Sequence, residues 1–121
     1  MIHAANPAET GIDIYMGIGG APEGVLAAAA LRCTGGQMEG RLQLTTPEKR
    51  ARADALGIAE PNRIYSVEEM AWGDVVFAAT GVTDGNLLDG VRFQRDRITT
   101  HTLMMRSATR TIREMHAQHY I

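Results

Sequence analysis

The sequence lacks the features that mark several large classes of protein. Aromatic residues make up only 5% of its 121 residues, and its single cysteine excludes an internal disulfide. The longest apolar run, residues 25–31, is too short to span a bilayer. The N-terminus has no basic flank followed by an apolar core, so it does not resemble a signal peptide. We expect a protein of the reducing cytoplasm.

Charge of one sign does not dominate either. The formal net charge at pH 7 is −2 and the isoelectric point is about 6.0. Without a basic excess, we expect no nucleic-acid partner and no membrane partner. Hydrophobic residues make up 45% of the chain, which predicts a folded core and a single domain. We place a lead-in loop at residues 1–11 and the folded domain at residues 12–121.

The first part of that domain predicts strands alternating with helices. Ile12–Ile18 is short, and apolar residues stand at both its odd and its even positions, as in a strand buried on both faces. Pro22 suits the first turn of a helix that ends at Gly35, and a strand with alternating leucines follows at residues 37–45. A second helix over residues 47–56 comes next.

That second helix has an expected inward stripe of Ala51, Ala55 and Leu56. Ser66 and Glu69 then form a capping box, which predicts a third, short helix ending at Gly73.

The last part of the chain predicts mainly strands. Residues 74–81 are expected to form a buried strand, and residues 91–94 and 98–107 two strands joined by a turn. Residues 109–121 fit either a helical face or a final strand after a hairpin turn, and we favour the strand. The whole order indicates an α/β fold in which a mixed sheet, parallel at its start and antiparallel at its end, is flanked by helices.

The stretch GIGGAPEG, residues 17–24, is the strongest candidate site. A strand that ends in glycines and enters a helix directs free N–H groups and the positive end of the helix dipole at one point. Gly19 and Gly20 would let a phosphate approach the backbone there. Glu23 would compete for the same donors unless a divalent cation, Mg²⁺ or Mn²⁺, lay between carboxylate and phosphate.

A simpler reading of the same residues stays open. A glutamate in a first turn also complements the helix dipole, and paired glycines also make a tight turn. Two better known phosphate motifs do not fit, because Pro22 replaces the third glycine of the dinucleotide fingerprint and Glu23 stands where a Walker loop has its lysine.

Other polar residues are weaker candidates for a functional site. His116 and His119 would share a face on a helix but point to opposite sides of a strand. No third metal ligand lies at a spacing typical of a metal site, so we interpret the two residues as surface histidines. The loop at residues 79–85 is either the lining of a ligand crevice or a plain turn. His101 and Arg106, on a predicted strand, are either buried partners or exposed.

Four segments carry a resemblance to a known family: residues 11–42, 73–91, 99–107 and 109–120. Together they resemble the C-terminal part of the class II fructose-1,6-bisphosphatases of bacteria and cyanobacteria. The resemblance implies the C-terminal domain of the inositol monophosphatase-like fold. It also implies a metal-dependent phosphatase of gluconeogenesis that removes the 1-phosphate of fructose 1,6-bisphosphate and, in some members, acts on sedoheptulose 1,7-bisphosphate.

The resemblance also assigns roles within GGAPEG. The family glycine matching Gly20 contacts substrate, and the family acid matching Glu23 binds the divalent metal, Mn²⁺ or Mg²⁺. We expect Gly19 to present its N–H group to the same phosphate. No residue of this chain is expected to be catalytic by itself.

The chain departs from the family in extent. Most family metal ligands lie in an N-terminal part that this sequence does not contain, and one glutamate cannot hold the metals and position water alone. We therefore expect a fragment whose partners are a sugar bisphosphate and the missing part of the enzyme. Exposed apolar surface should drive association into a homo-oligomer. The alternatives are a non-catalytic association module and a related sugar or inositol monophosphatase.

Overall fold

The fold is that of a computed structural model, which describes residue 2 and residues 7–121. It has the order α1, α2, β1, α3, β2, α4, β3, β4, β5, β6. Within the range predicted as a lead-in loop, Pro7–Thr10 forms a single helical turn, α1. The remainder of that prediction, at residues 1 and 3–6, lies outside the described residues.

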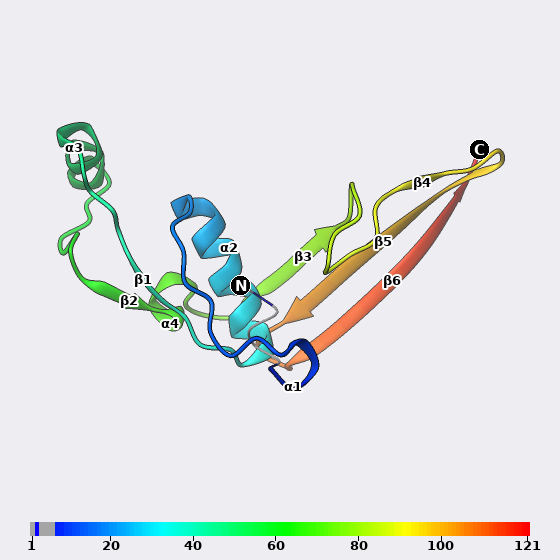
Figure 1. The fold of residues 1–121 in the computed structure, drawn as a ribbon, viewed down its shortest axis with the longest axis horizontal. Helices are drawn as coiled ribbons and strands as arrows, with labels where there is room; N and C mark the ends of the chain where they lie inside the picture. Colours follow the sequence, from blue (N-terminus) through cyan, green and yellow to red (C-terminus); the bar gives the residue numbers. More distant parts are fainter. Residues whose placement is uncertain (1, 3–6) are drawn as a thin grey trace.

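The larger sheet is built around a long hairpin (Figure 1). Strand β5 (Arg97–Arg106) pairs along its whole length with β6 (Thr111–Tyr120), and on its other edge with β3 (Val76–Thr80) and β4 (Arg92–Phe93). The hairpin turn is closed by the Arg110 N–H, which donates to the Ser107 carbonyl oxygen at 3.2 Å. The predicted strands at the C-terminal end, including the final one, are confirmed.

A second, smaller ribbon pairs β1 (Glu39–Arg41) with β2 (Ile64–Ser66). It leads to α3 (Pro47–Ala55), which stands apart from the rest of the chain in Figure 1. The capping box is confirmed: the Glu69 N–H donates to Ser66 Oγ, and the Ser66 N–H donates to Glu69 Oε2. The helix it opens, α4 (Val67–Met70), ends before the predicted Gly73.

Helix α2 (Ala21–Thr34) joins these two regions. It ends as predicted at Gly35, which has a left-handed φ of 80° and donates its N–H to the Leu31 carbonyl oxygen. One side of α2 packs on the larger sheet in a core of Ala30, Cys33, Leu88, Leu103 and Met105. The other side packs on α4 through Ala28, Leu31 and Val67. Its alanines let both layers approach closely.

The predicted strand at Ile12–Ile18 is wrong. Residues 11–20 have no regular structure and are exposed, with Ile18 86% exposed. A strand buried on both faces needs a neighbour on each edge and a layer over each face. The described residues supply neither.

The expected parallel start of the sheet is also wrong, because every strand pair among the described residues is antiparallel. The predicted buried strand exists as β3, but Val76 is 62% exposed, since none of the described residues forms a layer over that face. Of the strand predicted at residues 37–45, only the part that forms β1 is present.

The predicted inward stripe of α3 is wrong as well. Ala51, Ala55 and Leu56 are exposed, and Ala53 is the buried residue of this helix. The Thr46 side chain accepts a hydrogen bond from the Lys49 N–H, which caps the helix locally although few of its residues are buried. In the described part of the chain, no helix combines the length and apolar character needed to cross a membrane.

Candidate functional site

The N-terminus of α2 is the first part of the candidate site. Gly20 is the N-cap, with extended backbone angles (φ −66°, ψ 146°) and no side chain to cap the helix. The first intrahelical bond runs from the Gly24 N–H to the Gly20 carbonyl oxygen at 3.0 Å. Since Pro22 has no N–H, the N–H groups of the first turn that have no intrahelical acceptor belong to residues 21 and 23.

Glu23 is exposed and folds back over this N-cap. A Cβ added at Gly20 would overlap Glu23 Oε2, whereas one added at Gly19 would meet nothing within 4 Å. The structure therefore brings the Glu23 carboxylate close to Gly20 and leaves the backbone at Gly19 open. A carboxylate in this first turn would compete with an anion that approaches the helix, so a phosphate would share the site only with a cation between them.

The chemistry of this donor set fits a divalent metal only in part. A carboxylate is a suitable ligand for Mg²⁺ or Mn²⁺, but such an ion takes about six oxygens. Within the described residues, Glu23 belongs to no group of three or more His, Cys, Asp or Glu side chains placed to share one ion. Glu23 fits as one ligand of a site whose remaining ligands come from elsewhere.

The loop between β3 and β4 is held by its own contacts. Asp84 accepts two hydrogen bonds from the Arg92 guanidinium, at 2.7 and 3.0 Å, and one from the Gly90 N–H at 2.9 Å. The hydrogen bond from Arg92, followed by that from Gly90, lowers the pKa of the Asp84 carboxyl below its ordinary value. A Cβ at Gly90 would collide with the backbone of Thr83, so the loop is tightly closed. Of the two readings of residues 79–85, these contacts favour the turn.

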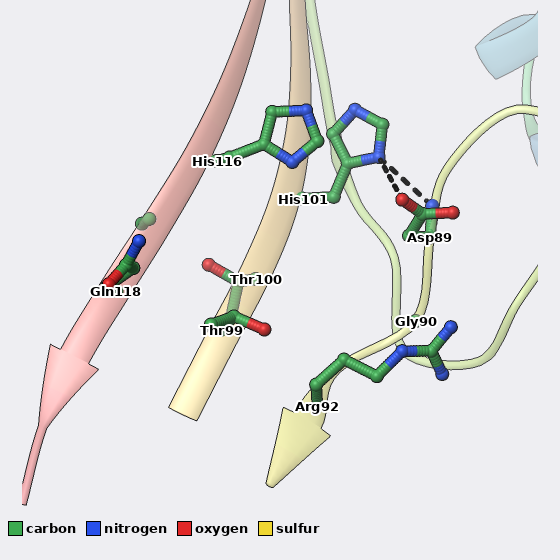
Figure 2. Close-up of a pocket in the computed structure, with 9 residues that line it drawn as sticks. Asp89, Gly90, Arg92, Thr99, Thr100, His101, His116 and Gln118 are labelled. Atoms are coloured by element: carbon green, nitrogen blue, oxygen red, sulfur yellow. Dashed lines mark hydrogen bonds and ion pairs between the residues drawn. The ribbon is translucent and has the colours of Figure 1, made fainter. Parts of the chain in front are cut away.

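A shallow hollow of about 230 Å³ lies beside this loop, on the β5–β6 hairpin (Figure 2). His101 and His116 are direct cross-strand partners, and their rings stack with centroids 4.1 Å apart. The Asp89 N–H donates to His101 Nδ1 at 3.0 Å, and Asp89 Oδ2 lies 3.7 Å from the same nitrogen. His101 Nε2 is buried without a hydrogen-bond partner in the described part of the chain.

This grouping was not predicted from the sequence. The sequence pattern paired His116 with His119, which the strand separates as predicted: His119 Nε2 lies 3.5 Å from Thr100 Oγ1, away from His101. The partner of His116 is His101, which is partly buried, while Arg106 is exposed. The signal that could have found the pair is the hairpin register, because a turn at residues 107–110 places positions 101 and 116 opposite each other.

Cys33 is a free, buried thiol. It is 2% exposed, and its Sγ donates to the Val75 carbonyl oxygen at 3.8 Å. Burial raises the pKa of the Cys33 thiol, which keeps it in the unreactive protonated form.

Comparison with known proteins identifies the family. The profile of the glpX-encoded bacterial fructose-1,6-bisphosphatases matches residues 1–119. The chain belongs to this family. Curated relatives include the D-fructose 1,6-bisphosphatase class 2/sedoheptulose 1,7-bisphosphatase of Synechococcus sp. (strain JA-3-3Ab), 46% identical over 117 residues, and that of Microcystis aeruginosa (strain NIES-843 / IAM M-2473), 40% identical over 124 residues.

These class II fructose-1,6-bisphosphatases are much longer than the chain. The match covers 86% of this chain but 34% of the Synechococcus relative, and 91% of this chain but 36% of the Microcystis relative. The chain therefore spans about a third of the length of the curated relatives it matches. Two thirds of a class II fructose-1,6-bisphosphatase have no counterpart here, which is consistent with a candidate site that has one carboxylate.

Proposed function

We propose that this chain supplies the C-terminal part of the active site of a metal-dependent class II fructose-1,6-bisphosphatase. In this proposal Glu23 is one ligand of the Mn²⁺ or Mg²⁺ ion. Gly20 and Gly19 present backbone N–H groups to a phosphate of fructose 1,6-bisphosphate. Sedoheptulose 1,7-bisphosphate is a second candidate substrate, since the names of the relatives include it.

The observation that carries the proposal is the position of the Glu23 carboxylate over the glycine N-cap of α2. There the helix dipole and the N–H groups of the first turn favour negative charge. A bound divalent cation would neutralise carboxylate and phosphate together and activate water for attack on phosphorus. The chain's own contribution is to hold one face of the phosphate and to fix one metal ligand.

The exposed apolar residues of the 11–20 segment support the second part of the proposal, which is that the missing part of the enzyme docks here. Ile14, Met16 and Ile18 are 73%, 83% and 86% exposed, and they lead directly into the glycines of the site. A partner that covered this segment would also bring its own carboxylates close to Glu23. The missing metal ligands and the missing apolar contacts would then come from one source.

The same exposed residues favour a second candidate function, a non-catalytic association module. Such a module would use the apolar segment to bind a copy of itself or another protein, without any role for Glu23. A related sugar or inositol monophosphatase is a third candidate, because the proposed loop would hold a single phosphate and would not select the rest of the sugar.

Complementation separates these candidates. The chain is co-expressed with the part of the Synechococcus (strain JA-3-3Ab) relative that it does not match, the assembly is purified, and inorganic phosphate release from fructose 1,6-bisphosphate is measured with Mn²⁺ and with EDTA. We expect turnover by the assembly alone, abolished by EDTA and restored by Mn²⁺. An assembly that forms without turnover would support the association module instead. Turnover of inositol monophosphate but not of the bisphosphate would support the third candidate.

A further inference from the structure

The cluster of Asp89, His101 and His116 is separate from Glu23 in the chain and in the fold. One potential ligand atom from each of these three residues lies within 4.8 Å of the other two. The residues come from the loop before β4, from β5 and from β6, so three segments meet at this point (Figure 2). We propose that these three side chains form a binding site for a divalent transition metal of the zinc class.

The backbone fixes the position of this cluster. His101 and His116 are paired in register, which places their side chains on the same face of the hairpin. The loop is pinned to His101 twice: the Gly81 N–H donates to the His101 carbonyl oxygen at 3.0 Å, and the Asp89 N–H donates to His101 Nδ1. A Cβ at Gly81 would collide with the Asp89 carbonyl oxygen, so glycine there allows the loop to come this close.

The donor distances are near those that one ion requires. Ligands at zinc bond lengths on a tetrahedral ion are about 3.4 Å apart. Asp89 Oδ2 and His101 Nδ1 are already 3.7 Å apart, and the His116 nitrogen must move inward from within 4.8 Å. His116 and Asp89 are exposed, so both side chains have room for that movement.

The protonation of His101 also suits coordination. Because Nδ1 accepts the Asp89 N–H, the neutral ring carries its proton on Nε2 and has a lone pair on Nδ1. A metal would take the lone pair on Nδ1 and leave Nε2 uncoordinated. The cost is the hydrogen bond from the Asp89 N–H, and the stacked arrangement of the two rings would have to open.

The ligand types select the metal. Two imidazoles and one carboxylate suit Zn²⁺ and its neighbours, whereas Mg²⁺ prefers oxygen ligands alone. Three protein ligands leave a fourth position for water or an exchangeable ligand. This site is therefore distinct in chemistry from the oxygen-ligand site proposed at Glu23.

Metal binding to the purified 121-residue chain tests the proposal directly, without any measurement of turnover. Metal-free chain is titrated with Zn²⁺ by calorimetry, and with Co²⁺ by visible absorption. We expect one Zn²⁺ per chain and a Co²⁺ spectrum typical of a site with nitrogen ligands. His116→Gln and Asp89→Asn should each weaken Zn²⁺ binding by at least about tenfold.

His119→Gln is the matched control, because it removes an imidazole from the same strand at a position away from His101. We expect it to leave the affinity unchanged. A ring-proton NMR spectrum adds a second readout: Zn²⁺ should shift the resonances of His101 and His116 and spare those of His119. Absence of stoichiometric binding, or equal losses in His116→Gln and His119→Gln, would overturn the proposal. Neither result would bear on Glu23.

Discussion

The Glu23 carboxylate lies over Gly20, three residues earlier, in the space where a larger residue would place its Cβ. This contact joins the only acidic residue in the first turn of α2 to the residue that caps the helix. A side chain larger than glycine at position 20 would displace this carboxylate. Substitution of either residue can therefore test the proposed site.

Gly20→Ala is expected to displace the Glu23 carboxylate. The added methyl group would overlap Oε2, so the side chain must turn away from the N-cap. In the complemented assembly, the Mn²⁺ concentration needed for half-maximal phosphate release should rise about tenfold or more. Gly24→Ala is the control, because a Cβ there meets nothing within 4 Å. Equal metal requirements for the two variants would show that the contact has no role in metal binding.

The Asp84–Arg92 ion pair should make stability depend on acid pH. Since the pKa of Asp84 is lowered in the folded chain, the pair contributes to the free energy of unfolding at pH values above the ordinary carboxyl pKa of about 3.9. This contribution is lost as the pH falls through the lower folded-state pKa. Asp84→Asn should therefore reduce stability at neutral pH and flatten its decline below pH 4.

Chemical denaturation at a series of pH values measures this effect. Asp96→Asn, in the turn between β4 and β5, removes one carboxylate from a nearby position and serves as the control. If both variants lost the same stability at every pH, the ion pair would not be the cause.

Cys33 should be slow to alkylate. Its thiol is 2% exposed and its pKa is raised by burial, so little thiolate is available at pH 8. Reaction with iodoacetamide should be about a hundredfold slower in the native chain than in denaturant. Mass spectrometry over time measures both rates. A native rate close to the denatured one would mean that the core around Ala30 and Met105 opens readily.

The exposed segment at Ile12–Ile18 should cause association of the isolated chain. Sedimentation velocity should give a mass above the 13.1 kDa of one chain, and Ile14→Asp with Ile18→Asp should shift it toward the monomer. Phe93→Asp, at another exposed apolar residue, is the control. A monomeric wild-type chain would remove the basis for a homo-oligomer and for the association module.

Local signals in the sequence predicted local structure well. The proline and glycine around α2, the capping box at Ser66 and the turns of the C-terminal hairpin each depend on neighbours within a few residues, and each is confirmed. The failures are at positions that depend on distant partners. Ile12–Ile18 and the stripe on α3 have the composition of packed elements, but the described residues contain nothing for them to pack on.

The candidate sites divide in the same way. Glu23 and Gly20 are three residues apart at the start of one helix, so both could be recognised as candidates from a short stretch of sequence. Asp89, His101 and His116 are separated by 12 and 15 residues, and a loop and a hairpin register bring them together. Their grouping could be recognised only once the pairing of β5 with β6 was known.

The central claim is tested most directly by Glu23→Gln in the complemented assembly. Glutamine keeps the size of the side chain and removes the charge that a divalent cation requires. Glu48→Gln is a close control, since Pro47 and Glu48 open α3 as Pro22 and Glu23 open α2. We predict that Glu23→Gln lowers Mn²⁺-dependent phosphate release from fructose 1,6-bisphosphate at least about a hundredfold, while Glu48→Gln leaves it unchanged. Full activity of the Glu23→Gln assembly at the same Mn²⁺ concentration would contradict the role of Glu23 as a metal ligand.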